Sequence, residues 1–385
     1  KLRRHIFIMN HYPSNVKEKL NSIILSMAEH HWLFSKNPGH DFTRQHLGKL
    51  SFYDTMRLII SMGKGSTNDE IMDYFDLDPD LIPLQSAFCQ RRRQISLSAF
   101  EYLFSEFSSS FPSTTDKFKD HCILACDGCH VVYATNSDII EDYNKPRLID
   151  YKGYNHMHLN GFVDVISKAF LDVVIQPGQQ PDEREALHSM LDHFTPDDPQ
   201  KYIITADRGY ESYDLLFHCE LKNLGYVFRV KSPSSPKSIL SYYASELPDD
   251  LEEFDVTIKR FFTDKATNIM KSQSDVYRYI NPSKNTPHFY ELLRKKHSHL
   301  YFLQFRVVKI KTAENTYEYL ITNLPFSFTL DDIRECYHWR WGIEISFRYL
   351  KHAAGLLYFH SKQPEFLKQE IYSRLILYNF GIFIA

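Results

Sequence analysis

The sequence predicts a mixed α/β protein in which helices flank a central sheet, with a helical N-terminal region and a β-rich insertion. Three observations indicate this organisation. Residues 14–110 carry apolar residues at helical spacing, whereas short apolar runs typical of strands begin near His121 and then alternate with helical segments. Between residues 232 and 316 the helical spacing is lost again. Strands followed by alternating helices and strands are typical of a mixed α/β core.

These changes of pattern give the expected domain boundaries. With 385 residues, of which 43% are hydrophobic, the chain is long enough for two or three regions with buried cores. We expect a helical N-terminal region at 1–118, the first part of the α/β core at 119–232, the β-rich insertion at 233–317 and the second part of the core at 318–385. Because the chain opens without Met and stops inside an apolar run, we also expect it to be a piece of a longer protein.

Helix signals are clear in the N-terminal region. Apolar spacing predicts helices over 18–27 and 51–62, and the glycines of Gly63-Lys-Gly65 then break the pattern. Ser66, or one of the next two residues, can cap a helix that runs through Phe75. Three adjacent arginines follow on or near another helix: Arg91, Arg92 and Arg93. They cannot share one helical face, so a phosphate-binding patch and a merely solvated run both remain open.

Two of the predicted core strands end in an aspartate. Strands are expected at 123–127, 156–166, 169–175, 202–207 and 226–230, and helices at 182–194 and 212–224. Asp127 and Asp207 end the first and fourth of these strands. A sheet fixes such a side chain while the strand end stays open to solvent, which suits a metal ligand. Each aspartate could also be a turn former, and Asp127-Gly128 is a hairpin signal.

A third carboxylate lies on a late helix. Steps of three, four and seven residues bring four polar residues within roughly 60° of arc: Tyr337, Arg340, Glu344 and Lys351. An adjacent apolar stripe would dock this helix on a core: Ile343, Phe347 and Leu350. A solvated face with ordinary salt bridges is the alternative. Together with Asp127 and Asp207, however, Glu344 completes a set of three oxygen ligands of the kind that Mg²⁺ prefers.

Three blocks of the sequence resemble the IS4-family DDE transposases of bacterial insertion sequences. They are Asp127-Gly128, Ala206-Asp-Arg-Gly-Tyr-Glu211 and the pattern Tyr-x2-Arg-x3-Glu-x6-Lys from Tyr337 to Lys351. Segments 42–52, 86–96 and 359–362 are similar as well, so the resemblance extends over in effect the whole chain. It implies an RNase H-like catalytic domain, with one Asp on the first strand, one on the fourth strand and the Glu on a late helix. It also implies a β-rich insertion before the Glu.

The resemblance implies an enzyme that cleaves DNA at transposon ends and transfers the strands into target DNA, as in cut-and-paste transposition. Asp127, Asp207 and Glu344 would be catalytic and hold two Mg²⁺ ions, for which Mn²⁺ can substitute. DNA-binding residues would be Tyr337, Arg340, Lys351, Arg208 and the cluster Arg91, Arg92 and Arg93. The expected partners are double-stranded DNA, namely the terminal inverted repeats and the target, and a second copy of the chain in a homodimer. The expected location is the prokaryotic cytoplasm, at the nucleoid.

Two other functions fit the same pattern. One is an RNase H-like DNA nuclease without strand transfer, and the other is a catalytically silent DNA-binding protein derived from a transposase; the intact carboxylates argue against the second. The net charge of −3 shows no overall basic signal, but phosphate binding depends on local clusters. The longest apolar stretch, near residues 375–385, is too short and interrupted to span a membrane.

Cysteine and tryptophan positions bear on two further hypotheses. Cys126-Asp-Gly-Cys129-His130 matches a haem-attachment pattern, but it overlaps the strand that carries Asp127, so we interpret these cysteines as strand packing. Related transposases stack a flipped base on a tryptophan of the insertion. This chain has its three tryptophans elsewhere, at Trp32, Trp339 and Trp341. An aromatic residue of the insertion would have to substitute: Phe261, Phe262, Phe289 or Tyr290.

Overall fold

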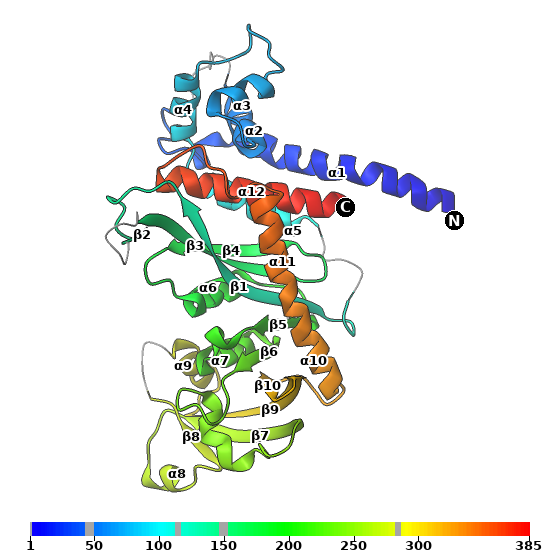
Figure 1. The fold of residues 1–385 in the computed structure, drawn as a ribbon, viewed down its shortest axis with the longest axis vertical. Coiled ribbons are helices and arrows are strands. Elements are labelled where there is room, and N and C mark those ends of the chain that lie inside the picture. The colour runs from blue at the N-terminus through cyan, green and yellow to red at the C-terminus, as the bar shows by residue number, and fades with distance from the viewer. Residues whose placement is uncertain (1, 43–49, 112–116, 146–152, 282–285) are drawn as a thin grey trace.

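A computed structural model of the protein describes residues 2–42, 50–111, 117–145, 153–281 and 286–385. Its centre is one ten-stranded sheet (Figure 1). The strands are β1 (Cys122–Tyr133), β2 (Tyr143–Asn144), β3 (Tyr154–Asp164), β4 (Phe170–Pro177), β5 (Tyr202–Ala206), β6 (Gly225–Val230), β7 (Phe254–Thr263), β8 (Tyr277–Tyr279), β9 (Leu300–Ala313) and β10 (Thr316–Thr322).

Helices surround this sheet. They are α1 (Leu2–Glu29), α2 (Phe52–Ser61), α3 (Thr67–Tyr74), α4 (Gln85–Gln94), α5 (Leu97–Ser109), α6 (Glu183–His193), α7 (Tyr213–Lys222), α8 (Asn268–Ser272), α9 (Pro287–Lys295), α10 (Leu330–His338), α11 (Gly342–His352) and α12 (Pro364–Ile384). Short 3₁₀ turns follow several elements, including η3 (Arg208–Tyr210) after β5, η4 (Ile239–Glu246) after β6 and η5 (Trp339–Trp341) between α10 and α11. None of the described helices is both long and apolar enough to cross a membrane.

The sheet has the RNase H-like arrangement, which confirms the predicted fold class. Its strand order is β2-β3-β1-β5-β6-β10-β9-β7-β8, with β4 paired to β3. β1 runs antiparallel to β3 and parallel to β5, and β5 runs parallel to β6. β5 is the fourth of the long strands along the chain, as the resemblance implies for the strand that precedes the second aspartate.

One strand is longer than predicted. β1 does not end at Asp127 but continues to Tyr133, because β3 pairs with it along its length, from Leu124 opposite Asp164 to Tyr133 opposite Asn155. The hairpin signal of Asp127-Gly128 is therefore wrong. On its other side β1 pairs with β5 only as far as Ala125. Asp127 lies two residues beyond that point, so the edge beside it is open even though the strand goes on.

The strands of the predicted insertion pair into the central sheet. β9 pairs with β10, and β7 pairs with β9 over ten residue pairs from Phe254–Lys309 to Thr263–Leu300. These strands therefore extend the central sheet, as the lower part of Figure 1 shows. The helices α8 and α9 also belong to this stretch of the chain.

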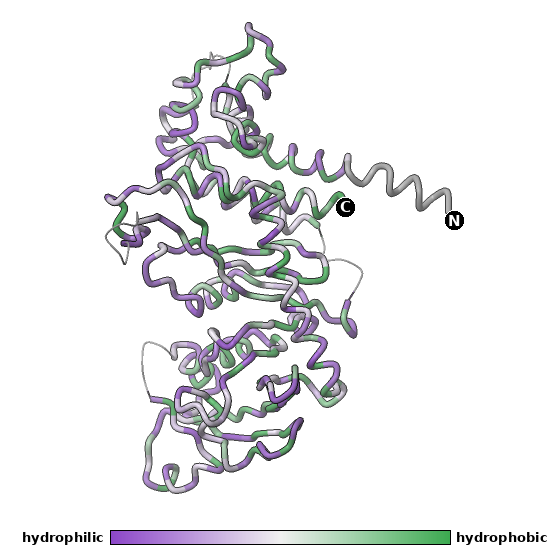
Figure 2. Tube along the Cα trace, viewed as in Figure 1, coloured by the Kyte–Doolittle hydropathy of each residue, from purple (hydrophilic) through white to green (hydrophobic). Residues whose placement is uncertain are grey.

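Two hydrophobic cores cover the two faces of the sheet. On β1, Ile123 and Ala125 join the core beneath α11, α12 and the N-terminal helices, whereas Leu124 and Cys126 join the core beneath α6, α7 and α9. Hydrophobic residues accordingly gather along the strands and in α12 (Figure 2). Because successive strand residues point to opposite faces, Asp127 falls on the α11 face and Gly128 on the α6 face.

Two N-terminal helices, α2 and α3, begin where the sequence predicts, whereas α1 (Leu2–Glu29) begins well before the predicted start at residue 18. Ser51 forms a capping box with Asp54 at the start of α2, and Ser66 forms one with Asp69 at the start of α3. The C-terminal helix α12 lies beside these helices (Figure 1). Arg374 of α12 donates to the carbonyl oxygens of Met62 and Gly63, at the end of α2. The two ends of the chain therefore form one helical layer over the sheet.

Candidate active site

The two strand aspartates are brought together by the parallel pairing of β1 and β5. Ala125 lies opposite Thr205 in the register of these strands. Asp127 and Asp207 each follow two residues later, so they lie at equivalent positions past this pair, Asp127 on β1 and Asp207 just after β5. Asp207 directly follows β5, as predicted, and its Oδ1 accepts a hydrogen bond from the Gly209 amide at 2.7 Å. That bond fixes the carboxylate at the start of η3.

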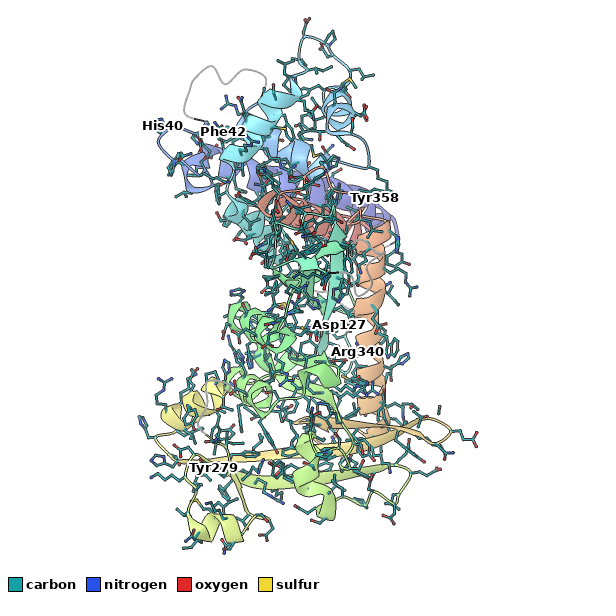
Figure 3. All side chains as sticks on the ribbon, turned by 60° about the vertical axis from the view of Figure 1, so that its left-hand side comes forward. His40, Phe42, Asp127, Tyr279, Arg340 and Tyr358 are labelled. Carbon is teal, nitrogen blue, oxygen red and sulfur yellow. The ribbon has the colours of Figure 1, made fainter. Side chains whose placement is uncertain are left out.

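Arg340 joins the third carboxylate to the first. Its Nη1 lies 3.6 Å from Asp127 Oδ2, and its Nη2 donates to Glu344 Oε1 at 3.3 Å. Figure 3 shows Asp127 on the sheet and Arg340 on the adjacent helical segment. Arg340 is 5% exposed, whereas the Glu344 side chain is 42% exposed. A buried guanidinium thus lies between two carboxylates that face the open edge.

The predicted helix is interrupted at this point. α10 ends at His338, η5 covers 339–341, and α11 begins at Gly342. The four polar residues are consequently not one solvated stripe, because Tyr337 and Arg340 are buried while Glu344 is exposed. The adjacent apolar stripe is confirmed, since all three of its members are buried: Ile343, Phe347 and Leu350.

The charge balance of the site favours a cation. Burial, and to a lesser extent the charges of Asp207 and Glu183, raise the pKa of Asp127 to about 6, although the Gly128 amide and Arg340 act in the opposite direction. An ordinary aspartate has a pKa near 4. A single guanidinium therefore does not offset the cost of burying the Asp127 charge beside Asp207 and Glu183. An oxygen donor set with excess negative charge suits a hard divalent cation.

A fourth carboxylate, which the sequence did not reveal, borders the site. Glu183 is the first residue of α6, and its Oε1 lies 3.1 Å from Nε2 of the buried His158. A methyl group added at Gly128 would meet His158 at 2.2 Å and Glu183 at 2.8 Å, so only glycine fits between them and β1. Glu183 thus approaches from the α6 face, opposite Arg340. The signal that could have found it is its position at a predicted helix N-terminus facing the sheet edge.

Lys351 lies along β1 from Asp127. It is half-buried on α11, and its ammonium is close enough to Cys129 to oppose the effect of burial, which raises the pKa of that thiol to about 11. Cys129 is two residues beyond Asp127 on the same side of the strand. Cys126 is fully buried and contacts Tyr210. These positions agree with strand packing for both cysteines and leave Lys351 at the border of the site.

The predicted arginine cluster divides in the structure. Arg92 is 4% exposed: its Nη1 lies 2.8 Å from Glu370 Oε1, and it donates to Gln369 Oε1 at 3.0 Å and to the Phe366 carbonyl at 2.8 Å. It therefore joins α4 to α12, and its place in the fold does not support the predicted contact with DNA. Arg91 is half-buried and Arg93 is exposed. Their role in DNA binding stays a prediction.

Arg208 lies on the surface next to Asp207. It lines a groove of about 350 Å³ with two other basic residues, Arg229 and Lys231. Arg229 is paired with Glu318 at 3.2 Å, and Lys231 with Glu211 at 3.3 Å. Two of the three cations in this groove therefore have acidic partners, and phosphate binding by Arg208 stays a prediction.

The candidates for base stacking fall into two groups. Phe262 and Phe289 are fully buried in the core, so they do not offer a ring face to a base, while Tyr290 is half-buried and Phe261 is 38% exposed. Trp339 and Trp341 are exposed on η5, where they flank Arg340 in the sequence. The 42–52 segment of the sequence resemblance lies largely outside the described residues.

A family model now assigns the chain. The model described as "Transposase DDE domain" matches residues 118–380, which include the sheet and all three predicted catalytic carboxylates. The chain belongs to this family. No curated protein matches the sequence of this DDE transposase. A solved structure described as the piggyBac transposase synaptic complex with hairpin DNA is similar at a TM-score of 0.44 and 11% identity, over 97% of this chain and 72% of that one.

The carboxylates of this transposase fit divalent cations by their chemistry. All the candidate ligands are oxygen donors, and Arg340 is a cation that contacts two of them, Asp127 and Glu344. Asp127, Asp207 and Glu344 would hold the ions, with Glu183 adjacent. When bound, such ions supply charge stabilisation and a more acidic water or hydroxyl group.

Proposed function

We propose that the chain is an IS4-family transposase that cleaves DNA at the ends of a prokaryotic transposon and joins those ends to target DNA, using two Mg²⁺ ions or Mn²⁺. One observation carries the proposal. Asp127 and Asp207 lie at equivalent positions past the last residue pair of β1 and β5, and Arg340 holds the Glu344 carboxylate on the same edge. Phosphodiester cleavage with two cations needs such a set of carboxylates at an accessible edge.

The residues around the carboxylates would position the DNA backbone. Arg340 offers a planar guanidinium whose contacts to Asp127 and Glu344 are long, at 3.6 and 3.3 Å. Once cations neutralise those carboxylates, the guanidinium can bind a phosphate with two donors. Lys351, which lies near Cys129 on β1, and Arg208, which follows Asp207, would bind neighbouring phosphates as half-buried and exposed cations. Tyr337 packs beneath Arg340, with the guanidinium carbon 5.6 Å from its ring centre.

Exposed aromatic rings next to the site would contact bases. Trp339 is 40% exposed and Trp341 is 53% exposed, and both belong to the turn that carries Arg340. An aromatic face can stack any base, so such contacts do not depend on sequence. We propose that these rings hold bases near the scissile phosphate in a complex of a homodimer with transposon ends and target DNA.

Purified protein tests this function directly. It is incubated with Mg²⁺ or Mn²⁺, a labelled duplex carrying the inverted repeat that flanks its gene, and a target plasmid. Joined products support the proposal. Cleavage without joining would replace it with a nuclease, and a mobility shift without cleavage would replace it with a silent DNA-binding protein. Without added divalent ions, we expect binding but no cleavage.

A further inference from the structure

Three histidines from three different helices meet away from the carboxylates. His188 lies on α6, His218 on α7 and His288 on α9, beneath the sheet face opposite α11. One nitrogen from each residue lies within 4.8 Å of the others. Within the described parts of the chain, this is the group of three or more His, Cys, Asp or Glu residues that meets this distance. The proposed DNA chemistry does not use it.

The rings have a definite arrangement. His188 Nδ1 and His218 Nδ1 are 2.9 Å apart, and their ring centres are 5.1 Å apart with planes 19° from parallel, so these two rings meet edge to edge. His288 stacks over both, with ring centres 4.3 Å from His188 and 3.8 Å from His218. His218 is 1% exposed. The two Nδ1 atoms therefore face each other in a closed, buried setting.

Carboxylates hold the outer nitrogens. His188 Nε2 lies 3.6 Å from Asp214 Oδ2, and His218 Nε2 lies 3.2 Å from Asp192 Oδ1. His288 Nδ1 is 2.7 Å from Asp214 Oδ2, and Asp214 is 2% exposed. An imidazole that faces a carboxylate carries its proton on that side. Each ring thus presents its other nitrogen as a lone pair.

The placement of the protons on the rings decides what the contact between the two Nδ1 atoms is. One proton between them gives a hydrogen bond of 2.9 Å. With each proton on Nε2, on the side of Asp214 or Asp192, both Nδ1 lone pairs face the same space. This second arrangement is the one that can bind a cation.

We propose that His188, His218 and His288 form a binding site for a divalent transition-metal ion of the Zn²⁺ class. Neutral imidazole is a preferred ligand of such ions, and a ligand histidine commonly donates its other N–H to a carboxylate, as Asp214 and Asp192 accept here. Bonds of about 2.0–2.1 Å with tetrahedral angles hold ligand nitrogens roughly 3.3 Å apart. To admit the ion, the 2.9 Å contact would open slightly, and the His288 ring, which is stacked parallel to the other two, would turn until its nitrogen points at the ion.

The ion would have a structural role. It would tie α6 and α7 of the core to α9 of the inserted stretch. α6 also begins with Glu183, so the same tie would hold that residue against Gly128 beside Asp127. Hard Mg²⁺, which prefers oxygen ligands, would not occupy the histidines.

Chelator-treated wild-type protein tests the proposal without any variant. Titration with Co²⁺ should give a visible d–d absorption band of a tetrahedral site that saturates at one ion per chain, and Zn²⁺ should abolish the band. Zn²⁺ should raise the Tm by several degrees more than Mg²⁺ does, because only Zn²⁺ would also occupy the histidines. Saturation without a tetrahedral band, or a Zn²⁺ effect on the Tm no larger than that of Mg²⁺, would overturn the proposal.

Variants locate the ion. His188→Gln, whose side chain is 12% exposed, should lose the Co²⁺ band, whereas His193→Gln, on the same helix with a 67% exposed side chain, should keep it. Asp127→Asn should also keep it, so failure of the DNA chemistry and failure of this site are separable. Loss of the band in Asp127→Asn, with retention in His188→Gln, would place the ion at the carboxylates and contradict the proposal.

Discussion

The two buried arginines Arg92 and Arg340 both contact acidic side chains, but they differ in whether those side chains are buried or reach solvent. Arg92 joins α4 to α12 through Glu370, which is itself 1% exposed. Arg340 lies between Asp127 and Glu344, whose side chains are 25% and 42% exposed. The Arg92 contacts are 2.8–3.0 Å long, whereas those of Arg340 are 3.6 and 3.3 Å. Arg92 and Glu370 therefore form a buried structural contact between α4 and α12, here called the joint. Arg340 and its two carboxylates form a site that solvent reaches.

The pKa values of the carboxylates show the same difference. Burial disfavours the charge of Glu370, but hydrogen bonds from His360 and the charge of Arg92 outweigh it and lower the pKa of Glu370. Burial also acts on Asp127, and there Arg340 does not outweigh it, so the pKa rises to about 6. The charge of Glu370 is therefore compensated within the fold, whereas the charge of Asp127 is not fully compensated by Arg340. That deficit is what a divalent cation would supply.

The largest stability effect should follow from breaking the joint. Arg92→Met should lower the free energy of unfolding by about 3–5 kcal/mol, because Glu370 would keep a buried charge without its partner. The neighbouring exposed residue provides the control, since Arg93→Met should change it by less than about 0.5 kcal/mol. Urea unfolding measures both. Equal effects of the two substitutions on the free energy of unfolding would contradict the structural role of Arg92.

Removal of the Arg340 side chain should slow DNA cleavage more than it destabilises the fold. Arg340→Met should cost about 1 kcal/mol or less in stability, because both of its carboxylates reach solvent. Loss of a charge-assisted bond worth about 1.5–3 kcal/mol should slow DNA cleavage about 10- to 100-fold. Cleavage assays and urea unfolding on the same preparation separate the two effects. A large stability loss with unchanged cleavage would make Arg340 a second structural joint.

The pH dependence of stability should also show the contribution of the buried Glu370 carboxylate. The folded-state pKa of Glu370 is below its ordinary value of 4.5, so the unfolded chain binds more protons as the pH falls through 4.5. The advantage of the wild type over Glu370→Gln is complete above that pH. It should shrink below it by up to about 1.4 kcal/mol per pH unit. Urea unfolding at pH 7, 4.5 and 3.5 measures this gap, and a constant gap would refute the assignment.

A single phosphate contact should give the smallest effect. Lys351→Ala should weaken binding to the transposon end and reduce the slope of log K against log salt by about 1, because one fewer counterion is released. Fluorescence anisotropy at several salt concentrations measures the slope. If the slope does not change, Lys351 does not bind phosphate.

The sequence predicted local features well and contacts between distant segments less well. The strand end at Asp207 was predictable, because the apolar run of β5 stops there. The length of β1 was not, because pairing with β3 extends it through Gly128 and His130, where the apolar pattern fails. Nothing in the sequence separates Arg92 from Arg93, since only the packing of α12 decides which one is buried.

The same limit explains what was missed in the site. Sequence spacing brought Tyr337 and Glu344 onto one helical face, but η5 shifts that register and leaves Tyr337 in the core. Glu183 has no motif of its own and reaches the site only because α6 packs beside β1 and β3. Pattern therefore predicts which residues form an element, while packing decides which of them meet.

The most direct test of the central claim is DNA cleavage by Glu344→Gln. The substitution removes a charge from the carboxylate set but leaves Arg340 and Lys351 to bind phosphate. With Mg²⁺ and a labelled transposon-end duplex, the variant should bind the duplex nearly as tightly as the wild type and cleave it more than about 100-fold more slowly, beyond the 10- to 100-fold cost of losing an outer partner of a metal ligand. Cleavage at the wild-type rate would contradict the assignment of Glu344 to the catalytic site.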